Sequence, residues 1–177
     1  NRLELSVEGD TDDRYKRVAY NAEAIDRLLV EVFLEAQQTT PEQIVVDLDA
    51  TDLPVHGHQE KRFFHGFYNS YCYLPLYIVC GEHLLGVRLR ASHIDASAGA
   101  LSEIQRIITQ IRERWPEVRI ILRADSGFCR DALMSWCEGD EGSGKRADYV
   151  FGFARNERLR QMIDAPMQQA AALHRET

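Results

Sequence analysis

The stretch of residues 43–52 (QIVVDLDATD) limits the possible folds of this chain more than any other. It starts as an apolar run and ends with three carboxylates, Asp47, Asp49 and Asp52. Because side chains alternate along a strand, Asp47 and Asp49 share one face, and the alternate apolar residues point to the other. A carboxylate at the end of an apolar strand is costly to bury unless it is paired or binds a cation. The pattern therefore predicts a strand that leads into a functional site, with surface acids in a turn before Pro54 as the alternative.

A second apolar strand, at residues 118–125 (VRIILRAD), also ends in an acid, Asp125. If it lies parallel to the first strand, Asp49 and Asp125 emerge at one edge of the sheet, where active sites of open α/β sheets gather. Facing carboxylates repel each other unless a cation lies between them, and Mg²⁺ prefers such oxygen ligands. The sequence thus predicts Asp49 and Asp125 as catalytic metal ligands, with Asp47 either supporting the site or packing between strands. A turn residue before Ser126 is the alternative role for Asp125.

The first half of the chain predicts a helix followed by an antiparallel meander. Asn21 is the expected N-cap, and one apolar stripe of the helix should pack on the core. The stripe consists of Ile25, Leu28, Leu29, Val32 and Phe33. Residues 63–79 and 84–90 are expected to be two further strands, with buried aromatic side chains rather than a base-stacking platform. In the second of these strands, valine and leucine alternate with Arg88 and Arg90, so one of its faces should be solvated.

The second half alternates helices and strands. Helices are expected at residues 101–115 and 133–137, a strand at 149–153, and a final helical segment from Arg155 that Pro166 interrupts. Strands joined by short turns are antiparallel, and strands joined through helices are parallel. The predicted fold is therefore α/β, with a mixed five-stranded sheet flanked by helices: an antiparallel three-strand meander and then parallel crossovers. Residues 1–40 are predicted to be a lead-in with a helix packed on the core, and residues 41–177 to be the core itself.

Composition excludes some classes of function. A net charge of −7 argues against a domain that grips nucleic acid through a broad basic face. No apolar run approaches the roughly 20 residues of a membrane helix, so no membrane partner is expected. The four cysteines lack the short spacing of a zinc or redox motif, which predicts free thiols in a reducing cytoplasm.

Several long segments resemble a known family. They are DLDATD with LPVHGHQE, FFHGFYNSYCYLPLYIVCGEHLLGVRLR, RWPEVRIILRADSGFCRDALMSWCE and DYVFGFARN. Together they are similar to the DDE transposases of bacterial insertion sequences, and more narrowly to the transposase DDE domain of group 1, over about residues 15–157. The resemblance implies an RNase-H-like catalytic core that nicks DNA and transfers strands at the ends of a mobile element, with Mg²⁺, or Mn²⁺ as a substitute. The implied partners are the ends of the mobile element, the target DNA and, in the full-length protein, other copies of the same protein. The implied location is the bacterial cytoplasm, with association to the nucleoid while the transposase acts.

The resemblance also implies which acids act. Asp49 matches the first catalytic aspartate of the family in its D-x-T setting, and Asp125 matches the second. The catalytic glutamate of the family lies later, on a helix beyond an insertion, and none of Glu138, Glu141 and Glu157 fits it. We therefore expect a truncated core with two of three metal ligands, the third lying beyond Thr177, and with little or no activity by itself.

Other residues and other functions stay open at this point. Lys61, Arg62, Arg155 and Arg158 are candidates for contact with DNA phosphates, and His56 and His58 for a turn or a DNA contact. The D-x-D-x-T spacing after a strand also fits a haloacid-dehalogenase-like phosphatase, with Asp47 as nucleophile and Asp49 as acid/base. A non-catalytic, decayed transposase remnant is the other alternative.

Overall fold

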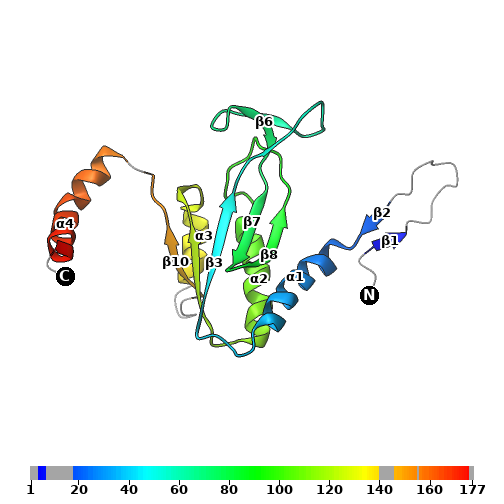
Figure 1. Cartoon of the computed structure of the whole chain (residues 1–177), viewed down its shortest axis with the longest axis horizontal. Helices are drawn as coiled ribbons and strands as arrows, with labels where there is room; N and C mark the ends of the chain where they lie inside the picture. Colours follow the sequence, from blue (N-terminus) through cyan, green and yellow to red (C-terminus); the bar gives the residue numbers. More distant parts are fainter. Residues whose placement is uncertain (1–3, 7–17, 140–145, 155, 176–177) are drawn as a thin grey trace.

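The computed structural model describes residues 4–6, 18–139, 146–154 and 156–175, and a mixed five-stranded sheet forms its centre (Figure 1). The strands of this sheet are β3 Gln43–Ala50, β7 Leu76–Cys80, β8 His83–Arg88, β9 Arg119–Ala124 and β10 Asp148–Phe151. Their spatial order is β10-β9-β3-β7-β8. The pairs β3–β7 and β7–β8 are antiparallel, whereas β9 runs parallel to β3 and β10 parallel to β9. The predicted fold class is confirmed, and this arrangement is consistent with an RNase-H-like fold.

Helices cover one face of the central sheet. They are α1 Ala22–Ala36, α2 Ala100–Arg114 and α3 Asp131–Glu138. Helix α1 packs on β8 and α2, and α2 in turn contacts α3. The buried side chains of β3 are Ile44, Val46 and Leu48, which lie in the same apolar cluster as residues of all three helices. The opposite face, which carries Asp47 and Asp49, is more exposed.

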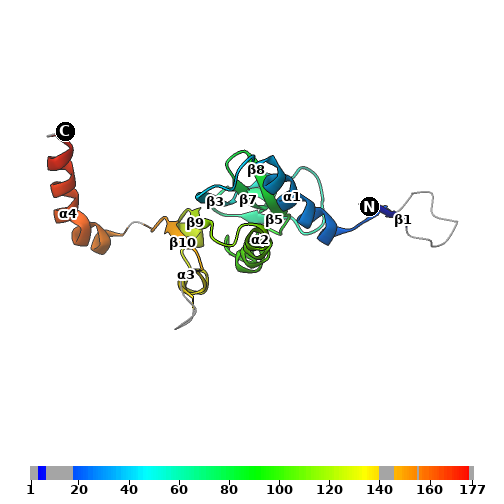
Figure 2. The same cartoon turned by 90° about the horizontal axis from the view of Figure 1, so that it is seen from below.

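The helix α4, Glu157–Arg175, has no buried residue and extends away from the sheet (Figures 1 and 2). It was expected to be interrupted at Pro166, but the structure shows one helix that runs through this residue. A proline inside a helix removes one backbone hydrogen bond and bends or breaks the helix. Here the helix continues past it, so the proline does not set a boundary.

Helix α1 begins as predicted, but its buried side is shifted from the predicted stripe. The Asn21 side chain accepts a hydrogen bond from the Ala24 amide at 3.0 Å, which confirms the N-cap. The predicted apolar stripe is confirmed in part: Phe33 is buried and Ile25 and Leu29 are partly buried, but Leu28 and Val32 are 40% and 51% exposed. The buried residues of α1 are Asp26, Val30, Phe33 and Leu34.

The buried acid of α1 is explained by Arg88 of β8. Its Nη1 and Nη2 donate to the two carboxylate oxygens of Asp26 at 2.7 and 2.5 Å, and its Nε donates to Oε1 of Glu103 in α2 at 2.8 Å. The strand β8 alternates as predicted, but its arginine points to the helices. Val87 and Leu89 take the outward positions and are 37% and 66% exposed. Three charged side chains thus join α1, α2 and β8, and they set the side that α1 buries.

The aromatic segment after β3 forms a separate sheet. Its strands are β4 Leu53–Pro54, β5 Phe63–His65 and β6 Ser70–Tyr73, paired antiparallel in the order β4-β6-β5. The prediction that all of residues 63–79 belong to buried strands of the main sheet is therefore wrong. Phe64, Phe67 and Tyr71 are 54%, 85% and 50% exposed. The main-sheet strand starts only at Leu76, after Pro75, whose missing N–H cannot join a ladder of hydrogen bonds.

Two short strands precede α1, β1 Glu4–Ser6 and β2 Val18–Tyr20, and they pair antiparallel. Residues 4–6 had been expected to lie in a loose lead-in. The four cysteines form no disulfide bond; Cys72, Cys80 and Cys137 are buried and Cys129 is partly buried. Across the described residues, the structure contains no helix of the length and apolarity needed to cross a membrane.

Candidate functional site

The parallel pairing of β3 with β9 brings the two predicted acids to one rim of the sheet. The last registered pair is Leu48 opposite Ala124. Asp49 and Asp125 are the next residues on the two strands, and both are exposed. Residues directly opposite each other on neighbouring strands point to the same face, and Asp125 keeps an extended backbone, with φ −75° and ψ −174°. The two carboxylates therefore leave the sheet side by side on the face that the helices do not cover.

Local hydrogen bonds fix Asp125. It is the N-cap of the short 3₁₀ helix Ser126–Phe128, and its Oδ1 accepts a hydrogen bond from the Gly127 amide at 2.8 Å. Phe128, which is 1% exposed, anchors this turn in the core. The turn role that the sequence offered as an alternative for Asp125 is thus present. It uses one carboxylate oxygen and holds the side chain in one orientation, as a metal ligand would require.

Two glycines pack closely on Asp125. A Cβ at Gly127 would lie 2.9 Å from Oδ1 of Asp125, and a Cβ at Gly152 would lie 2.9 Å from the Ser126 amide nitrogen and 3.1 Å from the Asp125 carbonyl carbon. The Gly152 amide also donates to the Ala124 carbonyl at 2.9 Å, which extends the pairing of β10 with β9 past its last registered residue. The sequence indicates a turn at Gly127, but it does not indicate that either glycine packs against Asp125. In each case the absent side chain leaves room for the Asp125 turn.

Asp47 lies on the same face as Asp49 and pairs with Arg123. Arg123 is its registered neighbour on β9, and Nε and Nη2 of Arg123 donate to the two carboxylate oxygens of Asp47 at 2.5 and 2.9 Å. Asp47 was predicted either to support the metal site or to pack between strands, and the structure shows it in contact with the neighbouring strand β9. This pairing also occupies the carboxylate that would be the nucleophile of a phosphatase, and the antiparallel β7 beside β3 differs from a doubly wound parallel sheet.

Tyr68 is a site residue that the sequence reasoning missed. Its hydroxyl donates to the carbonyl oxygen of Ala50 at 3.3 Å, directly after Asp49. Burial raises the pKa of Tyr68, and the negative charges of Asp52, Asp49 and Asp125 raise it further. The negative charges of all three carboxylates thus disfavour ionisation of the Tyr68 hydroxyl. In the sequence this residue is one of many aromatics, and no local signal marks it.

The predicted basic residues are not gathered in one place. Lys61 and Arg62 lie in the loop that leads into β5 of the small sheet, Arg158 lies on α4, and Arg155 falls outside the described residues. Figure 1 shows α4 and the small sheet on different sides of the central sheet. His56 and His58 are both exposed in the loop that precedes Lys61. In the described parts of the chain, no three histidine, cysteine or acidic side chains converge to hold a metal ion. The acid pair therefore supplies only part of a ligand set.

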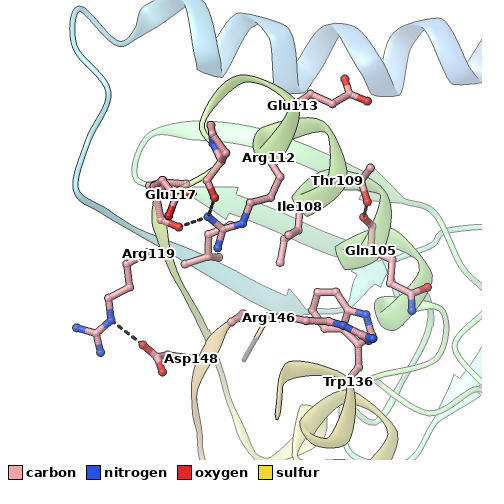
Figure 3. Close-up of a pocket in the computed structure, with 14 residues that line it drawn as sticks. Gln105, Ile108, Thr109, Arg112, Glu113, Glu117, Arg119, Trp136, Arg146 and Asp148 are labelled. Atoms are coloured by element: carbon pink, nitrogen blue, oxygen red, sulfur yellow. Dashed lines mark hydrogen bonds and ion pairs between the residues drawn. The ribbon is translucent and has the colours of Figure 1, made fainter. Parts of the chain in front are cut away.

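A large pocket lies away from the acids. Its volume is about 990 Å³, and it opens between α2, α3 and the first residues of β9 and β10. Figure 3 shows Trp136 and Arg146 on one side of it, Arg112 on another, and the ion pair of Arg119 with Asp148 at its border. Since β9 begins at Arg119 and ends at Ala124, this pocket lies at the opposite end of the strand from the acids. This pocket is therefore not part of the candidate site at Asp49 and Asp125.

A family model described as transposase DDE domain, group 1, matches residues 1–177, the full length of the chain. No curated protein and no solved structure matches it.

Proposed function

This chain belongs to the group 1 family of DDE-domain transposases, and we propose that Asp49 and Asp125 hold the divalent cation with which it cuts and joins DNA. Family membership supports a polynucleotidyl transferase that acts on DNA. The observation that supports these two residues is the register of β3 with β9, which carries both carboxylates to one rim of the sheet. We propose the ends of a mobile element and its target as the DNA substrates.

The donor set fits a hard divalent cation in part. Two exposed carboxylates on one face supply the oxygen ligands that Mg²⁺ and Mn²⁺ take, and such ions usually keep waters and substrate phosphates as further ligands. When bound, the cation would activate an attacking water or 3′-hydroxyl and stabilise the leaving oxygen of an in-line displacement. Because no third acid joins the pair within the described residues, we expect weak metal binding and little activity from these residues alone.

The neighbouring residues of the chain prepare this rim. The Gly127 amide orients Asp125, and Arg123 neutralises Asp47, so that Asp47 adds less repulsion to the acid pair. The phenol of Tyr68 is protonated at neutral pH, as that of an ordinary tyrosine is, and burial raises its pKa further. Its hydroxyl donates a hydrogen bond to the Ala50 carbonyl and so ties the end of β3 to the small sheet.

Titration with Mn²⁺, followed by calorimetry, tests this proposal. We expect Asp49→Asn and Asp125→Asn each to weaken Mn²⁺ binding by roughly tenfold or more, since even residues that only support metal ligands cost about 10- to 100-fold. Asp47→Asn is the matched control, because it removes one carboxylate from the same strand and face. It should change the affinity by less than about threefold.

The outcomes separate the alternatives. Retained affinity in both Asp49→Asn and Asp125→Asn would overturn the metal assignment and favour a non-catalytic remnant. Loss of phosphoester hydrolysis in Asp47→Asn, with metal binding intact, would instead favour a phosphatase with an aspartate nucleophile.

A further inference from the structure

The small sheet presents aromatic rings to solvent. Phe64 on β5 and Tyr71 on β6 are directly opposite in the register and therefore share a face. Their ring centroids are 5.6 Å apart in an edge-to-face arrangement, and the side chains are 54% and 50% exposed. Phe67, in the turn between these strands, is 85% exposed. A cluster of large exposed rings on a short sheet is the usual sign of a binding surface.

Positive charge accompanies these rings. The Arg62 guanidinium lies over the Tyr71 ring, 4.5 Å from its centroid, and Nη2 of Arg62 is 3.2 Å from Nδ1 of His58. Between residues 53 and 73 the charged side chains are Glu60, Lys61 and Arg62, so this segment is net positive in a chain of net charge −7. Flat rings combined with cations match the two parts of a nucleic acid strand, its bases and its phosphates.

One of these rings, Phe67, is connected to the strand that carries Asp49. Phe67 and Tyr68 are adjacent and meet edge to face, with centroids 5.0 Å apart. The Tyr68 hydroxyl bonds to the carbonyl of Ala50, the residue after Asp49. Through Tyr68, the exposed Phe67 is thus connected to the end of β3, at the rim that carries Asp49 and Asp125. A base on Phe67 would have its own phosphates close to that rim.

From this continuity we propose that Phe64, Phe67 and Tyr71 bind unpaired bases of a DNA end by stacking, with Arg62 and Lys61 on the flanking phosphates. This inference rests on the function proposed for Asp49 and Asp125, to which it adds the form of the substrate: a DNA end with unpaired nucleotides next to the reacting phosphodiester. Blunt duplex DNA has its bases stacked internally and would gain little from these rings.

Binding of two fluorescent DNA probes to the full chain, in Ca²⁺ at fixed salt, tests the proposal by anisotropy. One probe is a blunt 20-base-pair duplex, and the other carries in addition a four-nucleotide single-stranded 3′ overhang. Stacking on an aromatic side chain contributes about 5- to 150-fold in affinity per base. We therefore expect the overhang probe to bind at least about tenfold more tightly than the blunt one.

Leucine variants isolate stacking from apolar contact. Phe67→Leu and Phe64→Leu keep an apolar side chain but remove the ring, and each should reduce the preference for the overhang by about fivefold or more. Val32→Ala on α1, where the valine is 51% exposed, is the control for the loss of an exposed apolar group and should change nothing. As a second readout, 5-iododeoxyuridine placed in the overhang should crosslink within residues 62–73.

Equal binding of both probes, no binding of either, or unchanged binding by the leucine variants would overturn the proposal. So would a change in oligomeric state of Phe67→Leu on sedimentation, which would make this face a contact between copies of the chain. Mn²⁺ titration of the same variants without DNA separates the two proposals. Phe67→Leu should bind Mn²⁺ as tightly as the unsubstituted chain, because it does not change a proposed metal ligand. A result that contradicts stacking would therefore leave the metal proposal standing. The metal proposal is tested separately, by the Mn²⁺ affinity of Asp49→Asn.

Discussion

Replacement of Gly152 by alanine tests whether close packing holds Asp125 in place. An added Cβ would lie 2.9 Å from the Ser126 amide nitrogen, 3.1 Å from the Asp125 carbonyl carbon and 3.3 Å from its Cα. Ordinary van der Waals contacts of a Cβ begin near 3.4 Å, and all three neighbours are backbone atoms that cannot rotate away. The turn that carries Asp125 must therefore move by a few tenths of an ångström.

The expected cost of this movement follows from overpacking. Added methyl groups in well-packed sites cost about 1–3 kcal/mol. For a chain of this size, that lowers the melting temperature by roughly 2–12 °C. Because the displaced residue is the proposed ligand Asp125, Mn²⁺ affinity should also fall, by roughly tenfold. Circular dichroism during heating and calorimetric titration measure the two effects.

The matched control is Gly66→Ala, the same chemical change at a glycine with nothing within 4 Å of the added Cβ. It should leave both the melting temperature and the Mn²⁺ affinity unchanged. If Gly152→Ala does not fold, Gly127→Ala provides a second variant, because its Cβ would meet Oδ1 of Asp125 at 2.9 Å. The reasoning is refuted if Gly152→Ala folds and matches Gly66→Ala in both measurements.

Two further predictions concern stability. Arg88→Met leaves Asp26, which is 8% exposed, without its ion pair, and should lower the free energy of unfolding, measured in urea, by about 2–4 kcal/mol. The control is Arg119→Met, which removes an ion pair of a 62% exposed arginine and should lower the free energy of unfolding by less than about 1 kcal/mol. An equal loss in the two variants would contradict the role given to the Asp26 pair. The second prediction concerns stability at low pH. Hydrogen bonds from Arg130 and Ser97 lower the pKa of Asp95 from 3.8 to about 2. The ionised Asp95 side chain therefore contributes fully to stability above pH 3.8, and this contribution is lost as the pH falls through about 2. Because the Asp95 side chain is 49% exposed, this contribution should be below about 1 kcal/mol. Urea unfolding between pH 5 and pH 2 should show a smaller loss of stability in Arg130→Gln than in the unsubstituted chain; parallel curves would show that this pair does not act.

The central sheet and its acidic rim could be predicted because both follow from local pattern and chain connectivity. The apolar runs that end at Asp49 and Asp125 give the two strands, and the helix before the second strand requires a parallel crossover. The register of Leu48 with Ala124 then places both acids at one rim, as expected. Their role as metal ligands stays a prediction until the titrations are made.

The side that α1 buries could not be predicted, because its cause is distant in sequence. An apolar stripe normally marks the core side of a helix, yet Leu28 and Val32 remain exposed. Asp26 is buried instead, because Arg88, 62 residues later, supplies two hydrogen bonds to it. Nothing near Asp26 in the sequence indicates this partner.

The aromatic segment was misassigned for a different reason. Alternation and aromatic content predict a strand, but they do not say which sheet the strand joins or whether its outer face is covered. Phe64 and Tyr71 pair with each other in a sheet too small to bury them. Pro75, which ends the segment, was a usable signal that the main-sheet strand starts later.

The distribution of charge explains how an acidic chain can act on DNA. With a net charge of −7, the chain as a whole repels a polyanion, and the exposed Asp49 and Asp125 add to this at the rim where a phosphodiester must bind. A divalent cation held by the two carboxylates would cancel their combined charge at that point. Lys61 and Arg62 lie in the loop that leads into β5 of the small sheet, and Tyr68 of the same sheet region bonds to the carbonyl of Ala50, the residue after Asp49. Attraction is therefore local, and we expect DNA affinity to depend on the divalent cation and on this one sheet more than on the total charge of the chain.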